Sequence, residues 1–370
     1  MADDDYLLDG VSIAALPKVS LHDHLDGGLR PQTIIELADE IGLDLPASDA
    51  SALGRWFAAH ADSGSLVEYL TTFDVTIAVM QTEAGLARVA RDWVLDLAAD
   101  GVVYGEARWA PEQHLARGLS LDAAVEAVQA GLEQGVADVR QTGGDIAVGQ
   151  LVTAMRHTDS SHDIARLAVR HRERGVVGFD IAGPEAGFPP SRHREAFDYL
   201  ASEFFPVTVH AGEADGPPSI RSALIDGRAL RLGHGVRIAE DLVIEHEDDD
   251  NSFVSLGQLA QWVRDRGIPL ELSPSSNLQT GAIAAWGDAL ADHPFDLLYQ
   301  LGFQVTVNVD NRLMSATSLT RELSLLADAF GYSLADLETF QLNAAEAAFL
   351  PLEDREDLAD QISLGFGAVS

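Results

Sequence analysis

The chain has 370 residues, of which 46% are hydrophobic, and this fits either one α/β barrel or two ordinary domains with ample core. Its formal net charge of −35 argues against nucleic acid and anionic membranes as partners, because both carry negative charge. It contains no cysteine, which excludes disulfides, thiolate metal sites and cysteine nucleophiles.

The remaining bulk features favour a cytoplasmic protein. No apolar stretch is long enough to span a bilayer, and the chain begins with acidic residues where a secretory signal would be basic. Lys18 is the only lysine and lies outside any glycine-rich loop, which excludes a P-loop nucleotide site. The preference for arginine over lysine fits either adaptation to salt or a coding bias, and the sequence does not separate the two.

The first eighty residues predict one strand followed by helices. Residues 1–10 are expected to form a solvated, flexible tail. A strand is predicted over residues 19–24 and a helix over residues 31–41, with a proline in the first turn of that helix. Residues 46–80 are expected to form a longer, mostly helical, lid-like insertion.

One face of that insertion is apolar. Leu66, Tyr69, Leu70 and Phe73 recur at i, i+3, i+4 and i+7, which places them on the same side of a helix. Such a face usually packs into a core. Alternatively, it covers the mouth of a pocket.

From residue 83 onward, predicted helices and strands alternate. The strands are expected over residues 102–109, 146–155, 176–181, 206–210, 231–234, 268–273 and 304–309. The helices between them are expected over residues 83–100, 121–139, 164–174, 194–203, 220–225, 256–266 and 295–301, with more helices at the end of the chain. The acidic run at residues 245–250 is expected to be an exposed loop.

The element count predicts the fold. With the opening strand there are eight strands separated by helices, which favours a (β/α)8 TIM-type barrel with added helices. An open, doubly wound sheet is the alternative, but it usually carries a phosphate-binding glycine loop, and no such motif is present. No break in composition marks a second domain, so residues 1–370 are expected to form a single domain.

Two histidines lie at the end of the opening strand. His22 and His24 are two residues apart, so their side chains share one face of the strand, with Asp26 just beyond. Two imidazoles on a rigid element form half of a metal site. The alternative is a pair of unrelated surface histidines beside a turn.

Further ligands are predicted at the ends of other strands. His210 closes the fifth strand and Asp310 follows the eighth, and the carboxyl ends of barrel strands surround one bowl. Alone, His210 could be a core histidine and Asp310 a turn residue. Together with His22 and His24 they supply three nitrogens and one carboxylate, a set that suits one zinc ion and a water molecule.

Two more residues are candidates for proton transfer. Glu213 lies three residues after His210 on a loop of small residues, where burial would raise its pKa and allow it to donate a proton. The alternative is an acidic residue at the start of a helix. His234 could take a proton from the activated water or orient it, or it could be a fifth ligand or a support for another ligand.

These motifs resemble the adenosine deaminase family of the metal-dependent amidohydrolases, over roughly residues 16–326. The resemblance rests on motifs that occur in the family's order. They are His22-Asp23-His24-Leu25-Asp26-Gly27, Val102-Val103-Tyr104 with Arg108, Asp180-Ile181-Ala182-Gly183, His210-Ala211-Gly212-Glu213, Leu232-Gly233-His234-Gly235, Ser273-Pro274-Ser275-Ser276-Asn277 and Asp310.

The resemblance implies a mechanism for a purine nucleoside. His22, His24, His210 and Asp310 would hold zinc and its water. Glu213 would protonate purine N1, and His234 would assist in deprotonating the water that adds to C6 and displaces ammonia. For the substrate, Asp26 would contact the ribose, the backbone of Gly183 would meet the N3 edge, His24 would lie beside the ligand, and the apolar face defined above would cover the pocket.

The chain departs from the family at two positions. Asn311 replaces an aspartate that donates a hydrogen bond to purine N7; an amide donates at any pH, whereas a carboxyl must be protonated. Recognition of N7 is therefore expected to persist. Pro184 stands where an acidic residue is common, and it is expected to stiffen the turn without touching the chemistry.

Alternative functions remain open at this stage. The L-D-G of the first motif favours a nucleoside over the free base adenine, and Asp26 near the 5′ position would repel a nucleotide's phosphate. Deamination of adenine or of a modified adenosine such as aminodeoxyfutalosine is the nearest rival. A catalytically silent purine-binding protein is the rival of another class, although no expected ligand is missing. The oligomeric state is not predicted.

Overall fold

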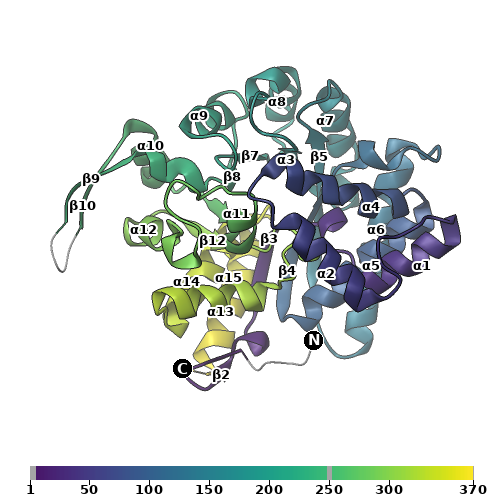
Figure 1. The fold of residues 1–370 in the computed structure, drawn as a ribbon, viewed down its shortest axis with the longest axis horizontal. Coiled ribbons are helices and arrows are strands. Elements are labelled where there is room, and N and C mark those ends of the chain that lie inside the picture. The colour runs from purple at the N-terminus through teal and green to yellow at the C-terminus, as the bar shows by residue number, and fades with distance from the viewer. Residues whose placement is uncertain (1–5, 248–251, 370) are drawn as a thin grey trace.

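The computed structural model describes residues 6–247 and 252–369. Within these ranges, eight parallel strands form the centre of the molecule (Figure 1). In chain order they are β3 (Lys18–His24), β4 (Val102–Trp109), β5 (Ala147–Met155), β6 (Val176–Ala182), β7 (Thr208–Ala211), β8 (Arg231–His234), β11 (Leu270–Leu272) and β12 (Val305–Val307). The order β3-β4-β5-β6 makes one run of bonded strands, and β7-β8-β11-β12 makes a second.

Two backbone bridges join these runs into a barrel. Phe179 in β6 pairs with Val207 just before β7, and Asp23 in β3 pairs with Asp310 just after β12. At the second seam the N–H of His24 also donates to the carbonyl of Asp310 at 2.7 Å. The predicted barrel is therefore confirmed, the open sheet is wrong, and every predicted strand is present within two residues at each end.

Helices surround the strands. Those between strands are α1 (Pro31–Ile41), α5 (Glu83–Ala99), α6 (Leu121–Gln141), α7 (Ser161–Arg170), α8 (Arg194–Ser202), α9 (Pro217–Ile225), α10 (Gln258–Asp265), α11 (Pro274–Gln279) and α12 (Phe295–Gln300). The chain then ends in α13 (Leu319–Phe330), α14 (Leu334–Ala347) and α15 (Leu352–Gly367).

Local sequence explains where these helices begin and how closely they pack. The side-chain oxygen of Thr82 accepts the N–H of Gly85 at 3.0 Å and so caps the start of α5. Helices α5 and α6 pack against each other, and Gly131 permits this, since a Cβ there would lie 2.2 Å from the carbonyl oxygen of Ala87.

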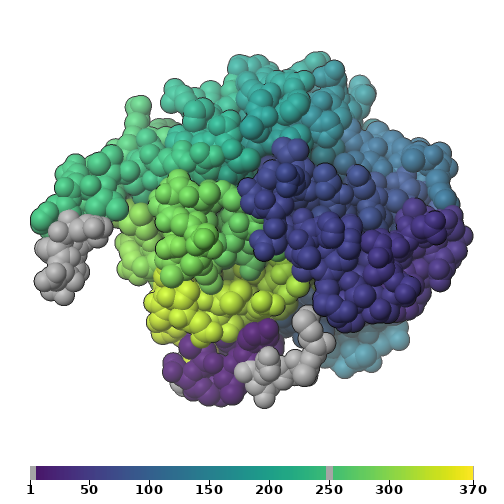
Figure 2. All heavy atoms as spheres, viewed as in Figure 1, coloured from purple at the N-terminus to yellow at the C-terminus, as the bar shows by residue number. Residues whose placement is uncertain are grey.

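Residues 46–80 form the predicted helical segment. It contains α2 (Ala50–Ala61), α3 (Leu66–Tyr69) and α4 (Phe73–Val79). In Figure 2 these dark-blue residues lie on the front face, beside the green residues that follow β11. A hydrogen bond of 2.8 Å from the N–H of Gly64 to the carbonyl of Gln279 joins the two segments.

Two hairpins depart from the sequence prediction. Residues 7–10 are not a tail, because β1 (Leu7–Leu8) pairs with β2 (Val11–Ser12). The second hairpin pairs β9 (Leu242–Glu247) with β10 (Ser252–Leu256) and projects from the body (Figure 1).

The second hairpin corrects two expectations. Residues 245–247 lie in a strand instead of a loop, while residues 248–250 and residues 1–5 fall outside the described part of the chain. The helix expected from residue 256 begins two residues later, because Leu256 pairs with Leu242 in the hairpin.

The only lysine is buried at the amino end of β3. Lys18 Nζ donates to the carbonyls of Ile13 at 2.8 Å and Leu16 at 2.7 Å, so the chain before the barrel is fastened to its first strand. Burial lowers the pKa of Lys18 to about 8, although Asp100 opposes the shift. In the described ranges, no helix is both long and apolar enough to cross a bilayer.

This lysine gives a prediction about stability. Between about pH 8 and pH 10.5 the unfolded chain holds a proton on Lys18 that the folded chain has lost, so unfolding becomes harder as pH rises. Relative to Lys18→Met, the wild type should gain about 3 kcal/mol of unfolding free energy across that window. Denaturant titrations of both proteins measure the difference, and a constant difference would show that Lys18 titrates normally.

Candidate metal centre and active site

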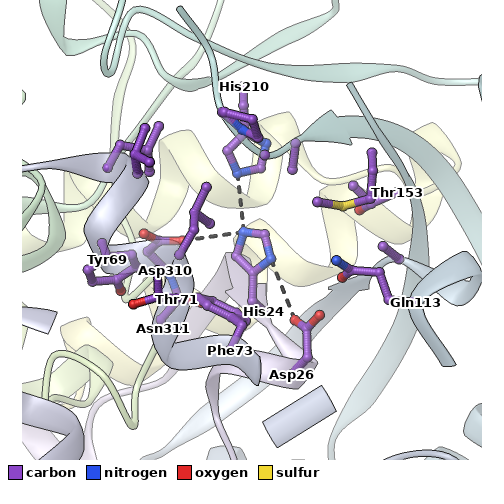
Figure 3. A pocket seen from close by; sticks show the side chains of 18 of the residues that line it. His24, Asp26, Tyr69, Thr71, Phe73, Gln113, Thr153, His210, Asp310 and Asn311 are labelled. Atoms are coloured by element: carbon purple, nitrogen blue, oxygen red, sulfur yellow. Dashed lines mark hydrogen bonds and ion pairs between the residues drawn. The ribbon is translucent and has the colours of Figure 1, made fainter. Parts of the chain in front are cut away.

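The four predicted metal ligands converge at the carboxyl end of the barrel. His22 and His24 come from β3, His210 from β7, and Asp310 follows β12. His24 Nε2 lies 3.1 Å from His210 Nε2 and 3.3 Å from Asp310 Oδ1. His22 Nε2 lies 3.3 Å from that same oxygen. Figure 3 shows His24 directed towards both His210 and Asp310.

Buried carboxylates orient two of these histidines. His22 Nδ1 lies 3.0 Å from Glu271 Oε2, and His210 Nδ1 lies 2.9 Å from Asp180 Oδ2. A carboxylate accepts a hydrogen bond, so each Nδ1 carries the proton and each Nε2 keeps its lone pair. Arg108 lies between the two carboxylates, with its Nη2 2.8 Å from Glu271 Oε2 and its Nη1 3.4 Å from Asp180 Oδ2.

This donor set fits a zinc ion. Zinc–nitrogen bonds of about 2.0–2.1 Å at tetrahedral angles separate two ligand atoms by about 3.3 Å. The 3.1 and 3.3 Å separations within the cluster match this value. Moreover, His22 Nε2 is buried, and Asp310 Oδ1, another of the predicted ligand atoms, lies 3.3 Å from it, as expected of two atoms that bind one cation.

His234 lies close enough to be a competing ligand. One ligand atom from each of His22, His210, His234 and Asp310 falls within 4.8 Å of the others. This grouping contains His234 in place of His24, so distance alone does not choose between the two sets.

His234 and Asp310 both have a strained backbone. Their φ angles of 62° and 56° lie in the left-handed region, which costs a non-glycine residue about 1 kcal/mol or more.

Glu213 is buried beside the cluster. Its Oε2 lies 3.6 Å from His234 Nε2. Burial, reinforced by the negative charges of Asp310 and Glu185, raises the pKa of Glu213 well above its usual range. A raised pKa favours the protonated form of the carboxyl, which is the form that a general acid requires.

Glu185 is a site residue that the sequence prediction missed. Its buried carboxylate accepts the backbone N–H groups of Gly212, Glu213, Ala214 and Asp215 at 2.6 to 3.0 Å. Four successive N–H groups on one anion form a nest that fixes the loop carrying Glu213. Only the neighbouring Gly183-Pro184 turn pointed to this segment in the sequence.

A cavity of about 340 Å³ lies above the cluster, in the range of small-molecule sites. All the residues predicted to bind substrate line it: His24, Asp26, Gly183, Asn311, Leu66, Tyr69, Leu70 and Phe73. Glu213 and His234 line it as well. Burial raises the pKa of Asp26 to about 7. Gln113 and Thr153, on the side opposite Tyr69 in Figure 3, were not predicted from the sequence.

The barrel and its cluster of histidines and aspartate define a metal-dependent hydrolase of the amidohydrolase class. A family model described as adenosine deaminase matches residues 17–364. The chain therefore belongs to the adenosine deaminase family, whose ligands are purine nucleosides or nucleotides.

Individual relatives agree with this assignment. The chain is 57% identical to "Adenosine deaminase 1" of Streptomyces coelicolor over 344 residues, which are 93% of this chain and 85% of the relative. It is 52% identical to the adenosine deaminase of Mycobacteroides abscessus over 96% of each chain. The crystal structure of an adenine deaminase from Arthrobacter aurescens superposes with a TM-score of 0.79 at 25% identity, covering 95% of this chain and 99% of that one.

The cluster predicts the result of removing one ligand. His22→Ala should abolish stoichiometric zinc binding, because the variant loses a ligand whose orientation is fixed by Glu271. Elemental analysis of the purified protein measures the loss. His171→Ala, which removes a histidine that instead contacts Asp122, should retain zinc. Full zinc content in His22→Ala would contradict the ligand role.

Proposed function

We propose that the chain is an adenosine deaminase of purine salvage. It would convert adenosine or 2′-deoxyadenosine and water into inosine or 2′-deoxyinosine and ammonia. The main support for the proposal is a buried carboxyl with a raised pKa, Glu213, beside three histidines and an aspartate in a nucleoside-sized pocket. We also propose that residues 1–370 form one domain, in which residues 46–80 cover the pocket.

The protein's own residues would prepare the purine for attack. Zinc, when bound by His22, His24, His210 and Asp310, supplies the Lewis acidity that makes water nucleophilic near neutral pH. Glu213 would donate its proton to purine N1, which makes C6 more electrophilic. The water oxygen then bonds to C6 and loses both of its protons. One proton restores the carboxyl of Glu213, and the other goes to the amino nitrogen, whose bond to C6 breaks so that it leaves as ammonia.

The pocket would select a nucleoside. Asp26 lines the pocket beside His24, with 3.9 Å between its Oδ1 and His24 Nδ1, and can hydrogen-bond a ribose hydroxyl. The face of Leu66, Leu70 and Phe73 would cover the purine and exclude water. When ionised, Asp26 would repel a 5′-phosphate, which favours nucleosides over nucleotides.

Ammonia release from a panel of substrates tests the proposal. Adenosine and 2′-deoxyadenosine should be the best substrates, with adenine, aminodeoxyfutalosine and AMP at least tenfold lower in kcat/KM. A clear preference for one of the latter three would overturn the substrate assignment. Zinc-loaded protein that binds adenosine without releasing ammonia would instead favour a silent purine-binding protein.

Replacing the general acid gives a sharper prediction. Glu213→Gln keeps the size of the side chain but cannot deliver a carboxyl proton, so kcat for adenosine should fall about 10²-fold or more. Zinc content should stay unchanged, as measured by elemental analysis. Glu356→Gln, an exposed carboxyl in α15, is the matched control and should retain full activity. Normal turnover by Glu213→Gln would refute the assigned role.

Asn311 predicts a pH effect. Asn311 lines the pocket, and its amide Nδ2 would be the donor for purine N7. In Asn311→Asp the donor exists only while the new carboxyl is protonated. The ratio of variant to wild-type kcat/KM should therefore fall as pH rises, and Asn311→Leu should be impaired at every pH. A parallel pH profile for Asn311→Asp would argue against the N7 contact.

A further inference from the structure

A chain of three hydrogen bonds runs from a backbone donor to His234. Phe295, the first residue of α12, donates its N–H to His293 Nδ1 at 3.0 Å. His293 Nε2 lies 3.2 Å from Asn277 Oδ1, and Asn277 Nδ2 lies 3.0 Å from His234 Nδ1. All four residues are buried, so water does not substitute for any link.

The backbone N–H of Phe295 determines the position of every proton in this series of hydrogen bonds. The N–H of Phe295 can only donate, and it has no partner inside its own helix because it lies in the first turn. His293 Nδ1 must therefore accept, which leaves the proton of the neutral ring on Nε2. Burial lowers the pKa of His293 to about 3, so this ring stays neutral.

The same reasoning sets the amide of Asn277. His293 Nε2–H needs an acceptor, which is Oδ1, so the Nδ2 group must point at His234. Turning the amide around would leave His293 with two accepting nitrogens and no proton, a state that a neutral imidazole does not have. The network therefore has one consistent arrangement.

We infer that Asn277 and His293 are positioning residues that hold His234 as the Nε2–H tautomer, so that His234 presents a hydrogen-bond donor to the pocket. His234 Nδ1 accepts from Asn277, and Nε2, on the side of Glu213, carries the proton. His234 then stabilises negative charge that develops on the attacking oxygen and does not act as the base that removes its proton. The catalytic role of His234 rests on the proposed function, whereas its tautomer does not.

The tautomer also decides between the two candidate ligand sets. A protonated Nε2 has no lone pair for zinc, and Nδ1 of His234 is held by Asn277. His24 has neither restriction, since its Nε2 faces His210 and Asp310. His24→Ala should therefore release zinc and His234→Ala should retain it. The reverse result would overturn the inference.

Nitrogen NMR tests the tautomer without any turnover. In zinc-loaded protein labelled with 15N-histidine, the His234 signals, assigned by their loss in His234→Gln, should report an unprotonated Nδ1 and a protonated Nε2 at neutral pH. A protonated Nδ1 in the wild type, alone or together with a protonated Nε2, would overturn the inference. Since no substrate is involved, failure here is distinguishable from failure of the proposed deaminase activity.

Isosteric variants test the origin of the effect. Asn277→Asp places a carboxylate against His234 Nδ1, which should become protonated because a carboxylate can only accept. Asn343→Asp makes the same change at an amide that donates to the carbonyl of Val305, and it should leave the His234 signals unchanged. If Nδ1 of His234 stays unprotonated in Asn277→Asp, residue 277 does not set the tautomer of His234, and the inference is refuted.

Kinetics separate positioning from a merely structural role. Asn277→Leu removes one neutral hydrogen bond behind His234, so kcat should fall about tenfold, while KM should change by less than about twofold. Zinc content should remain stoichiometric. A rise in KM with unchanged kcat, or parallel loss of zinc and activity, would mark Asn277 as structural and overturn its assignment.

Discussion

The buried carboxylate of Glu271 is the interaction on which the rest of the site depends. Its Oε2 lies 3.0 Å from His22 Nδ1 and 2.8 Å from Arg108 Nη2, and its Oε1 lies 2.6 Å from Arg231 Nε. Although burial opposes ionisation, these two arginines hold the pKa of Glu271 well below its usual range. Removing one partner of such a buried network costs about 3–5 kcal/mol. The centre of this barrel therefore contains fixed charges where many barrels have branched aliphatic side chains, and those charges orient the ligands above them.

The tautomers of the pocket histidines follow from what lies behind each ring. Carboxylates lie behind His22 and His210, so their protons are on Nδ1 and their lone pairs face the metal centre. An amide donor lies behind His234, so its ring is reversed. The barrel thus obtains two different functions from one residue type, metal ligation and hydrogen-bond donation, without any difference in the rings themselves. The tautomer of each ring is set by Glu271, Asp180 or Asn277, none of which lines the pocket.

Sequence reasoning could predict the fold and most of the candidate site because each signal was local. A histidine or aspartate at the end of a predicted strand needs only the barrel topology to reach the bowl. Asp9-Gly10, with φ angles of 52° and 84°, forms a hairpin turn. An Asp-Gly pair is typical of such turns, but the sequence prediction placed these residues in a tail. By contrast, Glu185, Asn277 and His293 act through partners distant in sequence or through backbone N–H groups, and no spacing rule identifies such contacts.

The loop after β7 shows how geometry and charge can come from one residue. Glu185 fixes the loop by accepting four successive N–H groups, and its charge, after burial and Asp310, adds to the rise in the pKa of Glu213. A neutral side chain at position 185 could satisfy some of those N–H groups but would remove the like charge. Positioning of the acid and retention of its proton are therefore coupled, and a substitution that alters one would alter the other.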